Sequence, residues 1–433
     1  MTLQSPQSDN RPFRRFVLFM LVLALLVVMT AYGWHQHTLQ SLHIASEFLP
    51  HLPPRAIKYQ RESRFIQLGD ILWNLVGISS ILTPFILKSF ISITNRLSTI
   101  MRVRSVQSPA LLEVVVMLLL IAMYLWIWSL PFSILTLLHE RRYHFSTTSV
   151  STFLRDAALG ITSSTLVAPV FWAGFRLRTK FANNWWRIVW VGCIPLFLCV
   201  TVLQPVIIAP LFNGYHYLSK SPLKDRIVSL CRLSGIKNSD VMVEDTSRRT
   251  LRVNAYVTGI GPSARIVITD NALRLLPDDQ LLAMIGHELG HYVHQDVLAS
   301  GIIGCLGIGG YLWMLNFGLQ RKQNCSEEAE SLQNLGLIPA VQVSIAVFLL
   351  IQSPVDSCIS RWHEWRADDY GLETTRLYVP TAKLMIGFAE RDYIDPDPPP
   401  ILQFWFGTHP TVLERIDHAL SFDRPLQTKK YNR

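Results

Sequence analysis

Long apolar stretches alternate with short polar connections along this chain, and their lengths predict membrane-spanning helices. A helix rises about 1.5 Å per residue, so roughly 20 apolar residues cross a hydrocarbon layer about 30 Å thick. Seven runs approach or exceed that length, at residues 16–34, 66–90, 110–138, 157–175, 185–211, 297–319 and 336–353. The pattern predicts a mainly α-helical, polytopic membrane protein with about seven transmembrane helices.

Three of these runs have features of their own. The first follows Arg14-Arg15 and is not followed by a small-x-small cleavage site, which favours an uncleaved anchor over a signal peptide. Pro84 within the second run predicts a kink in that helix. The fourth run is the weakest of the seven, because glycines and a proline interrupt it.

Two segments have the patterning of water-exposed structure, residues 213–296 and residues 355–433. In the first, apolar residues at helical spacing follow Ser221-Pro222, and short runs at 241–243, 253–257 and 265–269 predict strands. We therefore expect a small α+β domain that is split in sequence. The predicted division is a membrane domain with five spans at 1–212, the first part of the α+β domain at 213–296, two further spans at 297–354, and its second part with a C-terminal tail at 355–433.

Composition and charge agree with a membrane protein and argue against other classes. Half of the 433 residues are hydrophobic and only 16% are charged, which is too apolar for an ordinary soluble protein. We assign the net charge of +9 to basic residues flanking the spans. Since no aromatic–basic motif is present, we expect no nucleic-acid partner. The six cysteines form no C-x-x-C pair, so neither a disulfide framework nor a cysteine zinc site is predicted.

The chemistry is concentrated in one predicted helix, where residues 287–291 read His-Glu-Leu-Gly-His. Residues four apart share one helix face, so His287 and His291 point the same way and suit two corners of a tetrahedral zinc site. Glu288 can reach a water molecule at such a site without being a ligand. Gly290 is expected to leave the helix surface open beside the metal. A helix with two solvated histidines is the alternative interpretation.

Two histidines need a third protein ligand. His294 lies only three residues after His291, and one helix cannot easily bring a third side chain to the same ion. Glu364, on a later predicted helix, would complete a site of two histidines and one glutamate. Asp368 follows Glu364 by one turn and can accept a hydrogen bond from a ligand imidazole, which fixes its tautomer. Taken alone, an E-x-x-x-D pattern is also typical of a solvated helix face.

With these motifs in place, the chain resembles the type 1 integral-membrane CAAX prenyl protease family. These are zinc metalloendopeptidases of the gluzincin type, related to the bacterial heat-shock membrane protease. The shared pieces follow one another in order between residues 139 and 420. They are Pro210-Leu211-Phe212, Asn254-Ala255-Tyr256 with Gly259, Arg265-Ile266-Val267 with Asp270, residues 286–291, Ser360-Arg361, Glu364, Ala367-Asp368, His409-Pro410 and Glu414-Arg415-Ile416.

The resemblance implies a zincin-like catalytic domain with one Zn²⁺ per chain. The implied metal ligands are His287, His291 and Glu364, with Asp368 in contact with a ligand imidazole. The implied catalytic residues are Glu288, His409 and Arg415. The implied substrate-binding residues are Asn254, Ala255 and Tyr256. In this scheme His409 assists the transition state and Arg415 holds the site together. Zincins hold an extended peptide along an edge strand ahead of the metal helix, which is where residues 254–256 lie.

We therefore expect a membrane-embedded zinc endopeptidase, in contact with the lipid bilayer, that acts on a peptide or protein substrate. The resemblance implies prenylated C-terminal peptides. A membrane-protein quality-control protease without a prenyl requirement and a non-catalytic zinc-binding scaffold are the competing hypotheses. The short connection between the last two spans favours a bacterial inner membrane over the endoplasmic reticulum. Basic residues occur in loops on both sides of the membrane, so only the family pattern implies a cytosol-facing zinc site.

Overall fold

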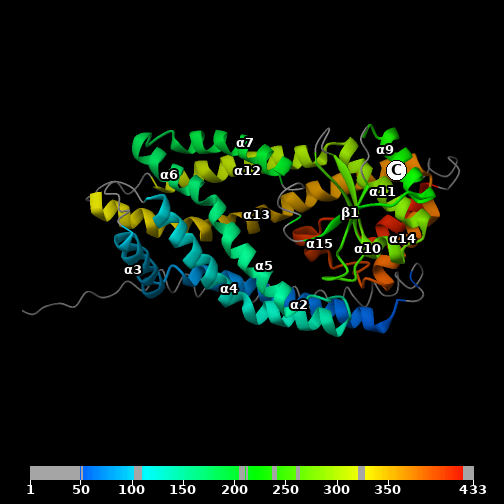
Figure 1. The fold of residues 1–433 in the computed structure, drawn as a ribbon, viewed down its shortest axis with the longest axis horizontal. Helices are drawn as coiled ribbons and strands as arrows, with labels where there is room; N and C mark the ends of the chain where they lie inside the picture. The colour runs from blue at the N-terminus through cyan, green and yellow to red at the C-terminus, as the bar shows by residue number, and fades with distance from the viewer. Residues whose placement is uncertain are drawn as a thin grey trace, which may run out of the picture.

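The computed structural model describes residue 49 and residues 52–101, 110–203, 210, 213–236, 241–259, 264–319 and 327–422. Figure 1 shows an elongated molecule, in which long helices run side by side at one end and a small sheet with its covering helices lies at the other. Helix α13, Glu327–Thr375, extends from the first region into the second. The mainly helical fold predicted from the apolar runs is confirmed.

Four helical segments in the described part of the chain are long and apolar enough to cross a membrane. They are α4 (Leu111–Arg142), the segment Val150–Lys180 formed by α5 (Val150–Ser163), a short 3₁₀ turn and α6 (Ala168–Lys180), α12 (Asp296–Leu319), and residues Leu335–Thr375 of α13. These helices expose large apolar side chains, such as Ile127 of α4 and Phe317 of α12. The hydrocarbon layer of a membrane would bury such side chains, whereas in water they would form an exposed apolar surface.

A further candidate span is broken in the middle. Helices α2 (Pro54–Ser80) and α3 (Pro84–Ile100) pass the same test together but are bent by 62°. Pro84 begins α3 and has no N–H to continue the helix, which confirms the kink predicted in this run. Helix α7 (Trp185–Leu203) is apolar but shorter. The first predicted run, residues 16–34, lies outside the described residues, so the count of seven spans is not confirmed.

The sheet consists of four short strands in the spatial order β1-β2-β4-β3. They are β1 (Tyr215–Tyr217), β2 (Val241–Glu244), β3 (Ala255–Thr258) and β4 (Arg265–Thr269). Strands β2 and β4 are parallel, while β1 and β3 pair with them antiparallel and form the two edges. Three strands lie where the sequence predicts them, with β3 starting two residues late. The three-residue strand β1 was not predicted.

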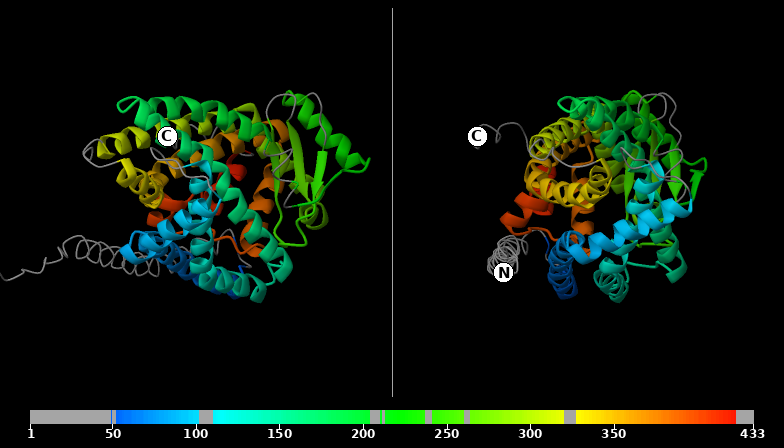
Figure 2. Two further views of the ribbon diagram at one scale, coloured as in Figure 1. Left: turned by 60° about the vertical axis from the view of Figure 1, so that its left-hand side comes forward. Right: turned by 90° about the vertical axis from the view of Figure 1, so that its left-hand side faces the viewer.

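One hydrophobic core joins the sheet to the helices around it. These helices are α9 (Pro222–Leu233), α10 (Asp270–Leu275), α11 (Asp278–Val293), α14 (Tyr378–Glu390) and α16 (Val412–Phe422). Figure 2 shows the orange and red C-terminal helices on one face of the green strands. Ile227, Ile268 and Ile285 are completely buried, and each such burial stabilises the fold by about 1.5–3 kcal/mol. The core thus fixes α11, which carries the two histidines, against the sheet.

Helix α11 and the C-terminal part of α13 cross at very short range, because each presents glycine at the contact. A Cβ atom on Gly290 would lie 2.7 Å from Cα of Ala367, and one on Gly371 would lie 2.9 Å from the backbone nitrogen of His287. The prediction that Gly290 leaves the helix surface open is therefore wrong, since Gly290 is needed for the helix crossing. The close approach brings the two histidines within reach of Glu364.

Candidate metal centre

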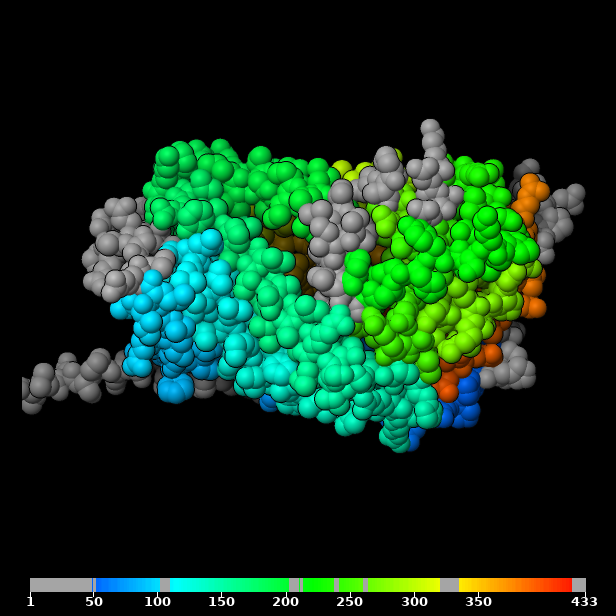
Figure 3. Space-filling view, in the orientation of Figure 1, coloured from blue at the N-terminus to red at the C-terminus, as the bar shows by residue number. Residues whose placement is uncertain are grey.

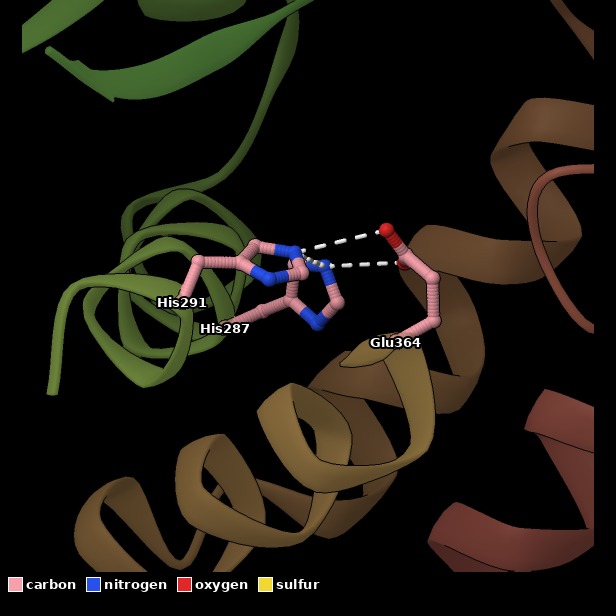
Figure 4. A group of neighbouring side chains, drawn as sticks. All are labelled: His287, His291 and Glu364. Atoms are coloured by element: carbon pink, nitrogen blue, oxygen red, sulfur yellow. Dashed lines mark hydrogen bonds and ion pairs between the residues drawn. The ribbon is translucent and has the colours of Figure 1, made fainter. Parts of the chain in front are cut away.

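Three potential metal ligands converge where α11 and α13 meet. Figure 4 shows His287 and His291 on one helix facing Glu364 on the other. His287 Nε2 lies 3.2 Å from Glu364 Oε2, and His291 Nε2 lies 3.3 Å from Glu364 Oε1. The two Nε2 atoms are 3.2 Å apart. All three ligand atoms lie within 4.8 Å of one another, so a single ion can contact all of them.

The second nitrogen of each imidazole already has a carboxylate partner. Nδ1 of His287 lies 2.8 Å from Asp368 Oδ1, and Nδ1 of His291 lies 2.8 Å from Asp296 Oδ2. If each Nδ1 donates its proton to that carboxylate, each Nε2 has a lone pair directed at its neighbours. Two lone pairs and a buried carboxylate would then face one another. A cation among them satisfies all three groups, so this set of donors fits a metal ion.

The charges around His287 also favour a cation. Burial alone would lower the pKa of His287, but the carboxylates of Asp368 and Glu364 outweigh burial and raise that pKa to about 10. Either a proton or a metal ion can supply the positive charge that these carboxylates stabilise.

Glu288 follows His287 on α11, and the pKa of its carboxyl group is raised. Burial raises the pKa of Glu288, and the neighbouring His287 and His291 oppose that rise without cancelling it. A carboxylate with a raised pKa accepts a proton more readily near neutral pH, which is the property that a general base requires.

Arg415 supports the site from behind. Its Nε and Nη2 atoms donate to the two oxygens of Asp368 at 2.8 and 2.7 Å, and the side chain is 8% exposed. Nη2 also lies 3.3 Å from Nδ1 of His287, and Nη1 lies 3.8 Å from Glu364. The paired hydrogen bonds fix the Asp368 carboxylate, which in turn fixes the ring of His287.

Comparison with known families connects this geometry to a protein class. Residues 218–422 match the sequence model of peptidase family M48, and residues 56–214 match the model described as the CAAX prenyl protease N-terminal region with five membrane helices. The C-terminal part of the chain, residues 218–422, belongs to peptidase family M48. The two models that match are thus a peptidase family and a membrane-helix region of CAAX prenyl proteases, as the resemblance implied.

Individual relatives agree with this assignment. The uncharacterized metalloprotease YhfN of Bacillus subtilis (strain 168) is 30% identical over 291 residues, covering 64% of this chain and 66% of that protein. A CAAX prenyl protease 1 homolog of Dictyostelium discoideum is 25% identical over 293 residues, with the same two shares. The chain thus spans about two thirds of the length of these relatives. The crystal structure of S. mikatae Ste24p gives a TM-score of 0.71 over 96% of this chain and 100% of that chain; at 19% identity it shows the fold alone.

In this M48 chain, His409 lies in the loop between α15 (Pro400–Phe406) and α16. Its Nε2 atom is 3.4 Å from Oε1 of Glu364, and its side chain is 58% exposed. The loop is held from α13 by Arg361, which donates to the carbonyls of Gln403 and Gly407 at 2.8 and 2.6 Å. The structure thus brings His409 to the accessible side of the metal centre, while Arg415 lies on the buried side.

The three residues predicted to bind substrate have different surroundings. Ala255 is 2% exposed and faces the core. The Tyr256 hydroxyl donates to Glu244 at 3.1 Å. Asn254 is exposed, and its backbone is paired with Thr269. Only the backbone of edge strand β3 and the side chain of Asn254 are therefore placed to meet a peptide, and substrate binding by this M48 strand stays a prediction.

Two residues at the metal centre were not predicted from the sequence. Asp296 is 6% exposed and contacts His291, as described above. His363 is 4% exposed, and its Nδ1 contacts the other oxygen of Asp296. The available signals were weak, namely an aspartate five residues after His291 and a histidine directly before Glu364.

Proposed function

We propose that this chain is a zinc-dependent endopeptidase that binds one Zn²⁺ through His287, His291 and Glu364. The observation that carries the proposal is the convergence of these three ligand atoms, with the remaining nitrogen of each imidazole held by a carboxylate. Two imidazoles and one carboxylate are typical of catalytic zinc sites, which keep a fourth position open. A purely structural zinc site would have four protein ligands and no role for Glu288.

In this proposal, each side chain around the ion has a different role in hydrolysis. Bound zinc supplies Lewis acidity toward the scissile carbonyl. Glu288 accepts the proton of the attacking water molecule and returns it to the leaving amine. His409, on the accessible side, donates a hydrogen bond to the oxyanion that develops on the carbonyl oxygen. Arg415 acts through Asp368 by keeping the ring of His287 in place.

The role of Glu288 is tested with the purified full-length protein and a peptide substrate. Glu288→Gln keeps the side-chain size but cannot accept the proton, so we expect cleavage to fall by about 10²–10⁴-fold with zinc retained. Glu373→Gln, on an exposed glutamate near the end of α13, is the matched control and should cleave normally. Cleavage by Glu288→Gln at the wild-type rate would contradict the mechanism.

For the substrate, we propose a peptide that carries a lipid near its scissile bond. A cavity of about 850 Å³ lies among α6, α7, α12 and α13 and is lined mainly by apolar side chains. Along α13 its wall runs from Leu337 to Ser360, a length of roughly 35 Å at the rise of a helix. Ser360 is one helical turn before Glu364. Figure 3 shows a recess in the surface bordered by α5 and α7, with α13 at its floor.

The position of the cavity supports a lipid substituent for a physical reason. Burial of each CH₂ group stabilises binding by about 0.8 kcal/mol, so a long apolar chain gains substantially from such a cavity. Its end near Glu364 places the attached peptide beside the metal ligands. Several relatives are named CAAX prenyl protease 1, which makes a prenylated C-terminal peptide the first candidate.

A pair of peptides with one sequence, farnesylated and unmodified, separates the two substrate hypotheses. We expect the farnesylated peptide to be cleaved with the lower KM. Equal kcat/KM for both would contradict the lipid-substrate proposal and favour a quality-control protease, while leaving the zinc endopeptidase proposal intact.

We further propose a multi-pass protein of a bacterial inner membrane with the zinc site facing the cytosol. The Bacillus relative and the short link between the last two spans support this placement. The division of the chain into four segments, with boundaries after residues 212, 296 and 354, belongs to the same proposal. The first boundary is supported by the two family models, which meet between residues 214 and 218. Reporter fusions after residues 145 and 422 test the orientation.

A further inference from the structure

We propose that Asp296 is a positioning residue that joins the two halves of the metal centre. Asp296 is the first residue of α12 and is 6% exposed. Its Oδ2 atom lies 2.8 Å from Nδ1 of His291, and its Oδ1 atom contacts Nδ1 of His363. His363 directly precedes Glu364 on α13. A single carboxylate therefore links one metal ligand on α11 with the neighbour of another on α13. This inference rests on the proposed zinc site.

The surroundings of Asp296 suit a buried carboxylate. Arg366 Nη1 lies 3.8 Å from its Oδ1 atom, and the Arg366 guanidinium stacks over Trp362 at 4.3 Å from the ring centre. The hydrogen bond with His291 and the nearby positive charge of Arg366 offset part of the cost of burying Asp296. The carboxylate thus has partners on α11 and α13 while belonging to α12.

The backbone before Asp296 is held in an unusual conformation. Gln295 has a φ of +56°, in the left-handed region that side chains other than glycine rarely adopt. This residue separates α11, which ends at Val293, from α12, which begins at Asp296. With the chain in this conformation, Asp296 contacts His291. Strained residues of this kind persist where surrounding structure fixes them, and they cluster at functional sites.

The contact has a chemical consequence for His291. A carboxylate that accepts from Nδ1 keeps the proton there and leaves Nε2 free to bind a metal ion. Asp368 does the same for His287, so the two ligand histidines have matching supports. Without Asp296, His291 can adopt the other tautomer, and His363 loses its contact with α12.

The experiment measures metal binding in the full-length protein in detergent. Zinc affinity is measured by chelator competition, and the Co²⁺-substituted protein is examined by visible absorption. We expect Asp296→Ala to weaken zinc binding by about 10–100-fold and to alter the Co²⁺ spectrum, with Asp296→Asn between it and the wild type. The matched control is Asp279→Asn, which removes a half-exposed surface partner of Arg226 and should change neither quantity.

The outcomes separate this inference from the zinc site itself. If both Asp296 variants have the zinc affinity and Co²⁺ spectrum of the wild type, the proposed role of Asp296 is wrong, while the proposed zinc site is unaffected. This holds even if the zinc-free variants melt at a lower temperature. A wild-type protein that binds no zinc would overturn the proposed function and this inference together. If Asp296→Ala does not fold, Asp296→Asn, which keeps the shape of the side chain, decides the question by the same two measurements.

Discussion

At the scale of single residues, the candidate metal centre depends on charged groups that lie behind the three proposed ligands. Each ligand histidine is held by its own carboxylate, and the two carboxylates are supported differently. Asp368 is fixed by two hydrogen bonds from Arg415, whereas Asp296 contacts His363 and lies near Arg366. The orientation of both imidazoles is therefore set by the surrounding side chains before any ion binds.

Arg415→Lys tests the first of these supports. A lysine keeps the positive charge but cannot form the paired hydrogen bonds to Asp368, so His287 loses its fixed orientation. We expect zinc affinity and kcat to fall by about 10–100-fold with a smaller change in KM. Arg226→Lys, at an exposed ion pair, is the control. Unchanged zinc affinity in Arg415→Lys would show that Asp368 needs no such clamp.

Asp270 provides a pH-dependent contribution to stability away from the metal. Burial alone would raise the pKa of Asp270, but hydrogen bonds from Ser247 and Thr246 outweigh it and hold that pKa below its usual value. A carboxylate whose pKa is lower in the folded state stabilises the fold above its unfolded pKa of about 4, and this contribution is lost as the pH falls further through the folded pKa.

We therefore expect Asp270→Ala to lower the free energy of unfolding by about 1–2 kcal/mol at pH 7. The difference from wild type should shrink progressively as the pH falls below about 4, because the unfolded carboxyl group then takes up a proton while the native one does so only at lower pH. Thermal unfolding in detergent at a series of pH values measures this difference. The same difference at every pH would contradict the assignment.

At the scale of helices and strands, the crossing of α11 and α13 determines whether the ligands meet. A Cβ atom on Gly290 would collide with the backbone of Ala367, so Gly290→Ala should separate the helices and cost about 1–3 kcal/mol of stability. Zinc affinity should fall with it. Gly310→Ala on α12 is the control, since no atom lies within 4 Å of its added Cβ. Unchanged zinc binding in Gly290→Ala would show that the crossing tolerates a wider spacing.

How much of this could be read from the sequence differs from element to element. His287 and His291 were predictable as candidates because helical spacing is a local property, and Glu364 was predictable because zinc sites with two histidines commonly take a glutamate as third ligand. The contact of Asp296 with His291 was not predictable, since it depends on the positive φ of Gln295, and the residue type alone does not predict such a backbone angle. The role of Gly290 was misjudged for a similar reason, because only the position of a second helix shows what a glycine faces.

At the scale of the whole molecule, the domain that contains the sheet is connected to the membrane helices by Arg252, just ahead of strand β3. Its guanidinium lies 4.4 Å from the ring centre of Phe145 and 3.3 Å from Glu140 of α4. It also donates to the carbonyl of Asp392 at 3.0 Å, in the loop after α14. The strand predicted to bind peptide is thereby held in a fixed place relative to the membrane helices.

The cavity in the membrane region gives a prediction at this scale. Gly304 of α12 lines the cavity, and no atom lies within 4 Å of a Cβ added there. Gly304→Phe should fill part of the cavity and raise KM for a farnesylated peptide several-fold, with little effect on the unmodified peptide. Gly310→Phe adds the same side chain on the same helix outside the cavity wall and serves as control. Equal effects of Gly304→Phe on both peptides would argue against lipid binding there.

The separation of the ligands along the chain also sets a time order for the appearance of activity. His287 and His291 are synthesised before α12 and α13, whereas Glu364 follows most of α13. A ribosome-bound chain therefore carries two of the three proposed ligands and the proposed base Glu288 well before it carries Glu364. Under the proposed mechanism, the chain therefore stays inactive until Glu364 has been synthesised, which is after α12 and most of α13.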